Sequence, residues 1–221
     1  KMTHEEWATK KVYFPSQDIS PILGYFKIKF SPQYKLLFKL MDRPDVHTLF
    51  AKWASQSGKS LFEMLIIGYR LDNEPANVLY MQPIKDDIPK VLRLKINPVL
   101  KCIKDLWQKF EDYIATEGIR SKDAIKQLAG GSLVVSGSSV KERKSLTVPL
   151  LVMDEIGEFD KGAVKEASER LKAFSKFFPK KIGVSTIVHP KDEICTNFEN
   201  CEAIIEWRYK CPNCKDNFYP S

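Results

Sequence analysis

The chain has 221 residues, of which 43% are hydrophobic, and it carries a net charge of +7 from 35 Lys and Arg against 28 Asp and Glu. The length and composition fit a soluble globular protein of one large or two small domains, and the positive charge favours a polyanionic partner. The sequence has no apolar run long enough to span a membrane. The N-terminus lacks the apolar core of a signal peptide and the five cysteines are irregularly spaced, which argues against a secreted disulfide framework and predicts a cytoplasmic location.

The predicted elements alternate between helix and strand along most of the chain. Residues 1–30 are mixed in character and are expected to form an N-terminal arm. Helices are predicted at 31–41, 59–71, 84–110 (broken at Pro98) and 161–177, strands at 48–53, 78–82, 132–136, 149–153, 181–186 and 203–209, and mostly loop at 113–131. This alternation predicts an α/β fold with a mostly parallel sheet flanked by helices, with 31–200 as its core and 201–221 as a C-terminal strand and linker.

A polar loop joins the predicted strand at 48–53 to the helix at 59–71, and it reads Ala-Ser-Gln-Ser-Gly-Lys-Ser from Ala54 to Ser60. Glycine lets the backbone approach a phosphate, and the N-terminus of the following helix attracts negative charge. Lys59 is therefore expected to reach the β- and γ-phosphates of ATP, and Ser60 to hold Mg²⁺. The predicted nucleotide contacts are Ser55, Gln56, Ser57, Gly58, Lys59, Ser60 and Leu61.

This loop alone is a weak signal, because Trp53 stands where a first glycine is expected and a polar turn is the alternative. A second motif strengthens it: the apolar run Leu150–Met153 leads into Asp154 and Glu155. Such a run predicts a strand buried on both faces, and acids at its carboxyl end lie at the ligand crevice of an open α/β sheet. Asp154 is expected to hold Mg²⁺ and Glu155 to activate the attacking water; the alternative is a solvated acidic turn.

Three weaker functional signals each depend on only one or two residues. Ser185 and Thr186 end the predicted strand at 181–186, where hydroxyls can sense the γ-phosphate. Arg143 is either a surface arginine or a finger that completes a neighbouring subunit's site. Cys211 and Cys214 resemble half of a zinc ribbon, and two thiolates cannot fill a tetrahedral zinc site. A second pair would have to lie beyond Ser221 or come from Cys195 and Cys201, whose spacing is poor, so we expect no complete metal site in this chain.

Taken together, these motifs resemble those of phage terminase large subunits, and the lambda-type (GpA-like) branch is the most similar. The resemblance covers about residues 30–220, and its two nucleotide motifs are shared by many ATPases. The hydroxyl-ended strand followed by Cys-Pro-X-Cys is more particular to this branch. The segments that carry it are, in order, Pro32-Gln33, Ala54–Ser60, Leu150–Glu155, Val184-Ser185-Thr186 and Cys211-Pro212-Asn213-Cys214.

The resemblance implies a P-loop NTPase of the RecA/ASCE type that serves as the N-terminal ATPase motor of bacteriophage DNA packaging. Such a motor uses ATP and Mg²⁺ to translocate double-stranded DNA into a procapsid in the host cytoplasm. Implied partners are a terminase small subunit, a portal and a homo-oligomeric ring, expected to be pentameric; a monomeric isolated domain stays an alternative. Nuclease activity is not expected, since we find no acidic ligand cluster for it.

The resemblance also assigns roles to individual positions. Gln33 is similar to the glutamine that contacts adenine, and Ser185 with Thr186 to the motif that couples hydrolysis to movement. Arg143 falls where relatives place an arginine between the loop and the acidic strand, which favours its role as a trans-acting finger.

Two other functions share some of these features. A two-lobed helicase or nucleic-acid-stimulated ATPase has the same motifs, but the remaining length cannot supply its second lobe. A regulatory nucleotide- or DNA-binding module would not need the complete set of Lys59, Ser60, Asp154 and Glu155.

Overall fold

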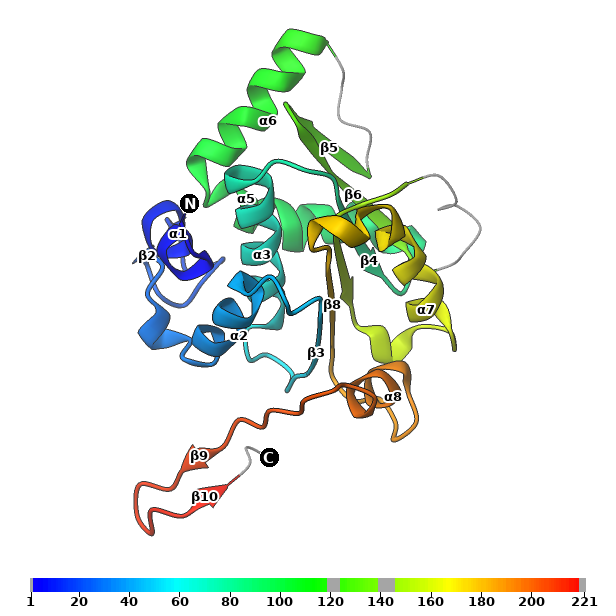
Figure 1. Cartoon of the computed structure of the whole chain (residues 1–221). Coiled ribbons are helices and arrows are strands. Elements are labelled where there is room, and N and C mark those ends of the chain that lie inside the picture. The colour runs from blue at the N-terminus through cyan, green and yellow to red at the C-terminus, as the bar shows by residue number, and fades with distance from the viewer. Residues whose placement is uncertain (1, 119–123, 139–145, 219–221) are drawn as a thin grey trace.

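The computed structural model describes residues 2–118, 124–138 and 146–218. At its centre lies a six-stranded sheet in the order β3-β8-β7-β4-β6-β5 (Figure 1). Five of the strands are parallel, and the edge strand β5 pairs antiparallel with β6, which confirms the predicted mostly parallel sheet. The strands are β3 (Thr48–Lys52), β4 (Val78–Gln82), β5 (Ile125–Leu128), β6 (Gly131–Gly137), β7 (Leu150–Asp154) and β8 (Lys180–Ser185).

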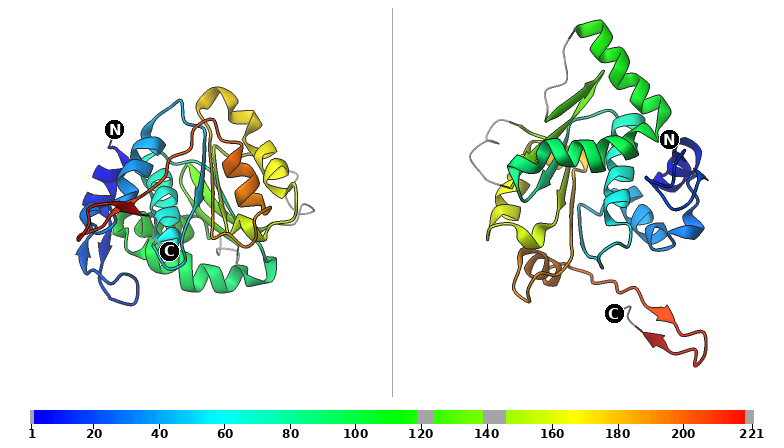
Figure 2. Two further views of the ribbon diagram at one scale, coloured as in Figure 1. Left: turned by 90° about the horizontal axis from the view of Figure 1, so that it is seen from below. Right: turned by 180° about the vertical axis from the view of Figure 1, so that it is seen from behind.

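Helices cover both faces of this sheet (Figures 1 and 2). One face carries α1 (His4–Lys11), α2 (Gln33–Asp42), α3 (Lys59–Asn73), α4 (Ile88–Val91), α5 (Asn97–Lys101) and α6 (Lys104–Glu117). The other face carries α7 (Ala163–Ser168), a 3₁₀ helix (Glu169–Phe177) and α8 (Glu193–Glu199).

The apolar runs of the central strands explain this three-layer arrangement. In β4, Val78 and Tyr80 belong to the core that includes α3, whereas Leu79 and Met81 belong to the core that includes α7. Successive side chains of a strand point to opposite faces, so a strand covered on both sides needs apolar residues at every position. β7 alternates between the two cores in the same way.

The N-terminal residues fold against the same helical layer. Trp7 of α1 is fully buried, and its indole N–H donates to the carboxylate of Asp72 in α3 at 2.8 Å. A short hairpin, β1 (Tyr13–Phe14) with β2 (Gly24–Tyr25), connects α1 to α2. These contacts tie the first thirty residues to the body of the domain.

The helical region predicted at 84–110 is interrupted at a different place from the one predicted. The break lies at residues 102–103 and not at Pro98, which occupies the first turn of α5. The preceding Leu92–Ile96 form a π-helical turn, from which the N–H of Asn97 donates five residues back. A proline lacks an N–H and is tolerated where a helical turn begins, which explains why the chain stays helical through this position.

Two other predictions are wrong. The region predicted as mostly loop, 113–131, contains the last turn of α6 and the strand β5. The strand predicted at 203–209 does not form: residues 203–208 are irregular, and only a small hairpin of β9 (Tyr209–Lys210) and β10 (Asn217–Phe218) follows. Helix α8 was not predicted either.

Among the described residues, no helix combines the length and the apolar character needed to cross a membrane.

Candidate active site

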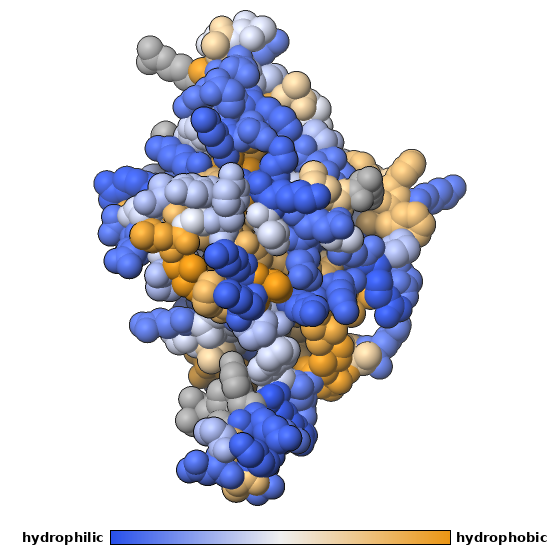
Figure 3. Space-filling view, turned by 90° about the vertical axis from the view of Figure 1, so that its left-hand side faces the viewer, coloured by the Kyte–Doolittle hydropathy of each residue, from blue (hydrophilic) through white to orange (hydrophobic). Residues whose placement is uncertain are grey.

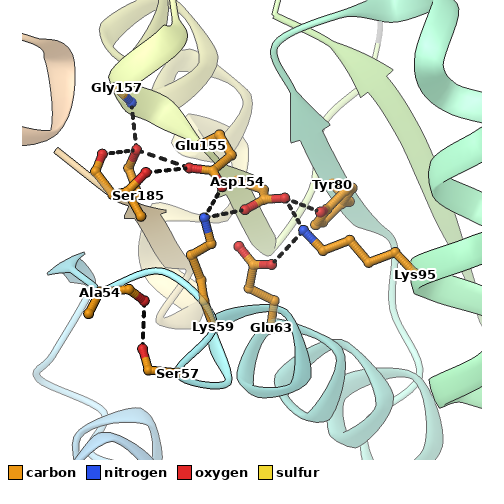
Figure 4. A network of polar contacts seen from close by, with 11 residues as sticks. Ala54, Ser57, Lys59, Glu63, Tyr80, Lys95, Asp154, Glu155, Gly157 and Ser185 are labelled. Atoms are coloured by element: carbon orange, nitrogen blue, oxygen red, sulfur yellow. Dashed lines mark hydrogen bonds and ion pairs between the residues drawn. The ribbon is translucent and has the colours of Figure 1, made fainter. Parts of the chain in front are cut away.

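The predicted phosphate loop lies between β3 and α3, at the edge of the sheet where the parallel strands end (Figure 4). Gly58 is the N-cap residue of α3 with φ of +94°, and no side chain of the described residues caps this helix. The Ser57 hydroxyl donates to the Ala54 carbonyl at 2.6 Å, and the Trp53 indole donates to the Ser57 carbonyl at 3.3 Å. The Tyr34 hydroxyl of α2 also donates to the Gly58 carbonyl. Side chains thus hold the carbonyls of the loop, and the first N–H groups of α3 stay available to an anion.

Gly58→Ala is expected to lower the melting temperature, because a left-handed backbone strains any side chain and a Cβ here would overlap the Tyr34 hydroxyl. The backbone conformation alone costs about 1–2 kcal/mol, or roughly 2–8 °C for a chain of this size. Gly162→Ala is the matched control, since Gly162 is the N-cap of α7 with φ of +88° and open space around it. Thermal unfolding should show a larger shift for Gly58→Ala; equal shifts would contradict a role for the Tyr34 contact.

The two predicted carboxylates stand at the end of β7. Asp154 is its last residue and is 5% exposed. Glu155 follows with φ of +51°, a left-handed conformation that is uncommon for residues other than glycine and is enriched at functional sites. The backbone thus turns sharply between the two acids, and both side chains meet the same lysine.

Lys59 connects the loop to these acids. Its ammonium forms an ion pair with Oε1 of Glu155 and lies 3.6 Å from Oδ1 of Asp154 (Figure 4). The Lys59 side chain is only 10% exposed. The three residues assigned to phosphate, metal and water from the sequence therefore form one contiguous group.

A second lysine approaches Asp154 from the opposite side. Lys95, in the π-helical turn before α5, forms an ion pair with Oδ2 of Asp154 and lies 3.6 Å from Oε2 of Glu63. The Tyr80 hydroxyl donates to the same Asp154 oxygen at 2.8 Å. Asp154 is thus fixed on one side by Lys95 and Tyr80, and its other oxygen faces Lys59 (Figure 4).

The pKa values of the ionisable groups in this cluster are shifted in different directions. Burial raises the pKa of Glu63 well above its ordinary value, and the neighbouring Asp154 carboxylate adds to this shift. Burial also raises the pKa of Asp154, but Lys95 and Lys59 outweigh it, so this pKa lies below its ordinary value. Burial lowers the pKa of Lys95, yet the two carboxylates raise it overall. Asp154 is therefore the more acidic of the two, and Glu63 holds its proton to a higher pH than an ordinary carboxyl group.

The hydroxyls of Ser185 and Thr186 face the second acid. Each lies 3.4 Å from Oε2 of Glu155, and Ser185 also accepts the backbone N–H of Gly157 at 3.0 Å. β8 lies between β3 and β7 in the sheet, so its end is placed between the loop and the carboxylates. The predicted sensor residues therefore contact the predicted base.

Most other predicted site residues also gather here. The Gln33 amide donates to the Ser57 carbonyl at 3.3 Å, which places Gln33 against the loop. Ser55 and Gln56 lie in the loop, and Ser60 and Leu61 in the first turn of α3. Cys211 and Cys214 lie apart from the site, on the C-terminal hairpin. Arg143 lies outside the described residues.

These residues fit a magnesium nucleotide. Oδ1 of Asp154 is buried and has no hydrogen-bond partner in the described part of the chain. Carboxylate and hydroxyl oxygens are the ligands that Mg²⁺ prefers, and Ser60 offers a hydroxyl at the start of α3. The uncapped start of the same helix suits phosphate oxygens.

Sequence reasoning missed Glu63, Lys95 and Tyr80. Glu63 gives one signal, since it is a charged residue inside the apolar run from Leu61 to Ile67, and a glutamate is almost never fully buried unless it is paired. Lys95 gives none, because lysines recur along its segment and only the fold selects this one.

Comparisons with known proteins identify the family and the fold of this chain. The family model described as the ATPase domain of phage terminase large subunit gpA matches residues 20–221. The crystal structure of the HK97 bacteriophage large terminase is similar with a TM-score of 0.66 at 13% identity, covering 90% of this chain and 40% of that one. A variant of the large terminase ATPase domain of Thermus phage P74-26 has a TM-score of 0.51 at 16% identity, covering 77% and 71%. Among curated proteins, none matches. The chain thus spans about two fifths of the HK97 protein, and at these identities the structures show the fold alone.

Proposed function

This chain belongs to the family of phage terminase large subunit gpA ATPase domains, and we propose that it hydrolyses ATP to drive double-stranded DNA into a procapsid. The observation that carries the proposal is the convergence of Lys59, Asp154 and Glu155 at the carboxyl edge of the parallel sheet. A lysine beside two acids at a helix N-terminus is suited to phosphoryl transfer, which depends on positioning and charge stabilisation.

Each residue of the site has a distinct task in this proposal. Ser60 and Asp154 would hold Mg²⁺, which when bound neutralises charge on the phosphate oxygens. Lys59 would exchange its carboxylate partners for the β- and γ-phosphates. Glu155 would take the proton of the attacking water, while Ser185 and Thr186 hold its carboxylate.

The remaining assignments concern the assembled motor. Gln33, next to the loop, would contact adenine. Ser185 and Thr186 would transmit loss of the γ-phosphate to the surface that grips DNA. Arg143 would complete the site of a neighbouring copy in a ring, with the small subunit and portal as further partners. The net charge of +7 suits a DNA-binding role.

Lys59→Ala is expected to abolish magnesium-dependent ATP hydrolysis and to weaken nucleotide binding strongly, because it removes the cation that meets the phosphates. Hydrolysis is measured by phosphate release and binding by calorimetry with ADP. Lys165→Ala, which removes an exposed lysine of α7, serves as the control and should match wild type. Wild-type turnover in Lys59→Ala would refute the proposal.

The same assay at rising protein concentration tests the ring. If Arg143 acts in a neighbouring copy, turnover per subunit rises with concentration in wild type and stays at background in Arg143→Ala. Turnover that is independent of concentration and survives Arg143→Ala would mean a self-contained ATPase.

A further inference from the structure

The C-terminal hairpin stands apart from the ATPase site and has no role in it. Figures 1 and 2 show β9 and β10 away from the sheet, at the end of an extended stretch that follows α8. Each strand has only two residues. Hairpins of this size are not stable in water by themselves, so something beyond its two backbone pairings must hold this one.

Among the hairpin residues whose side chains are described, only Cys211 is partly buried. Residues 210 and 212–217 are exposed, and Figure 3 shows mainly hydrophilic side chains on the visible face of the lower end of the molecule. The stretch leading to the hairpin exposes Ile204, Ile205 and Trp207 by 52%, 52% and 42%. Small units without an apolar core commonly rely on a metal ion or on further polypeptide.

The turn of the hairpin is built around two cysteines. The N–H of Cys211 donates to the Asp216 carbonyl at 2.8 Å, and the N–H of Lys215 donates to the Cys211 carbonyl at 3.1 Å. Lys215 has φ of +65°, which closes the turn in a left-handed conformation. Backbone N–H groups of Cys214 and Asn213, and the Cys214 thiol, also lie within hydrogen-bonding reach of the Cys211 thiol. The turn thus brings both sulfurs together and directs amide hydrogens toward one of them.

Two thiolates are half of what a structural zinc site requires. All five cysteines and all three histidines of the chain lie in its described residues. Within those residues, no three Cys, His, Asp or Glu side chains come together as metal ligands. Cys195, the cysteine of α8, is 4% exposed in the core. A complete tetrahedral site would therefore need two ligands beyond this cysteine pair.

We propose that the hairpin is a preformed half-site for Zn²⁺, in which Cys211 and Cys214 supply two thiolates and a second pair of soft ligands comes from another polypeptide segment. That segment is either a second copy of this hairpin or further polypeptide of a longer protein; both would supply the same ligand chemistry. Binding would fix a hairpin whose strands are joined by only two residue pairs, and would give the exposed stretch at 203–208 a defined direction.

Cobalt titration of the reduced 221-residue chain tests this proposal. Co²⁺ is the probe because a thiolate ligand gives a charge-transfer absorption that Zn²⁺ abolishes on displacement. We expect this absorption in wild type and its loss in Cys211→Ser and in Cys214→Ser. Cys201→Ser, at a partly exposed cysteine outside the hairpin, is the matched control and should retain it.

The stoichiometry distinguishes the two sources of the second pair. One metal for two chains, with dimers in sedimentation, supports a second copy. One metal for each chain, with absorption equivalent to two thiolates, supports completion by further polypeptide. No absorption, or absorption that survives both hairpin variants, overturns the proposal. Lys59→Ala should bind cobalt as wild type does, so this test stands independently of the proposed ATPase.

Discussion

Replacing Glu155 with glutamine is expected to reduce ATP turnover by about 10²- to 10⁴-fold, the usual contribution of a general base. Glutamine has nearly the same shape but cannot accept the proton of the attacking water. Affinity for ADP should be unchanged or higher, because Lys59 loses its ion pair with Glu155 and is released to meet the phosphates. Phosphate release gives the turnover, and calorimetry gives the affinity.

The control for this variant is Glu158→Gln. Glu158 is an exposed acid in the 3₁₀ turn that follows Glu155, and its replacement should change neither quantity. A parallel loss of ADP affinity and turnover in Glu155→Gln would show that Glu155 organises the site and does not act as its base. Retention of more than a tenth of wild-type turnover would also count against that role.

Replacing Lys95 with methionine is expected to destabilise the protein by roughly 3 kcal/mol, because it leaves the buried Asp154 carboxylate with one cation fewer. We take the lower end of the cost of breaking a buried ion pair because the Lys95 side chain keeps 22% exposure. For a chain of this size, such a loss lowers the melting temperature by about 6–12 °C. Thermal unfolding at neutral pH measures this decrease in melting temperature. The magnesium concentration needed for half-maximal ADP binding should also rise, because Asp154 is no longer held in place by Lys95.

Lys90→Met is the control, because Lys90 is exposed on the adjoining helix α4. A melting temperature equal to that of this control would contradict the structural role of Lys95.

Glu63→Gln is the companion variant. The raised pKa of Glu63 means that the folded chain binds this proton more tightly than the unfolded chain. Wild-type stability is therefore lost as pH rises above the ordinary carboxyl range, and Glu63→Gln should gain stability relative to wild type from acid to neutral pH.

The nucleotide motifs were predictable because each depends on residues that are neighbours in the chain. The continuous apolar run Leu150–Met153 predicts a strand covered on both faces, and β7 is such a strand. The glycine-containing loop before α3 is a local strand-turn-helix signal. Parallel strands end at one edge, so the meeting of loop and acids followed from the predicted sheet.

Other elements were not predictable because they need a distant partner. A strand exists only beside another strand, so the β-prone residues 203–208 stay irregular where the chain leaves the sheet. β5 forms, conversely, because β6 offers it an edge. The prediction of a break at Pro98 is wrong because Pro98 lies in the first turn of α5, directly after a π-helical turn, where its missing N–H is tolerated.

The sequence by itself determined which groups the candidate site offers: a Gly-Lys-Ser loop, a strand that ends in two acids and a strand that ends in two hydroxyls, with a cysteine pair near the C-terminus. Only the tertiary structure decided which further charges act on that chemistry. Glu63, Tyr80 and Lys95 come from three separate elements and meet at Asp154. Electrostatic interactions depend on distance in space and on burial, and neither is encoded in the spacing of residues along the chain.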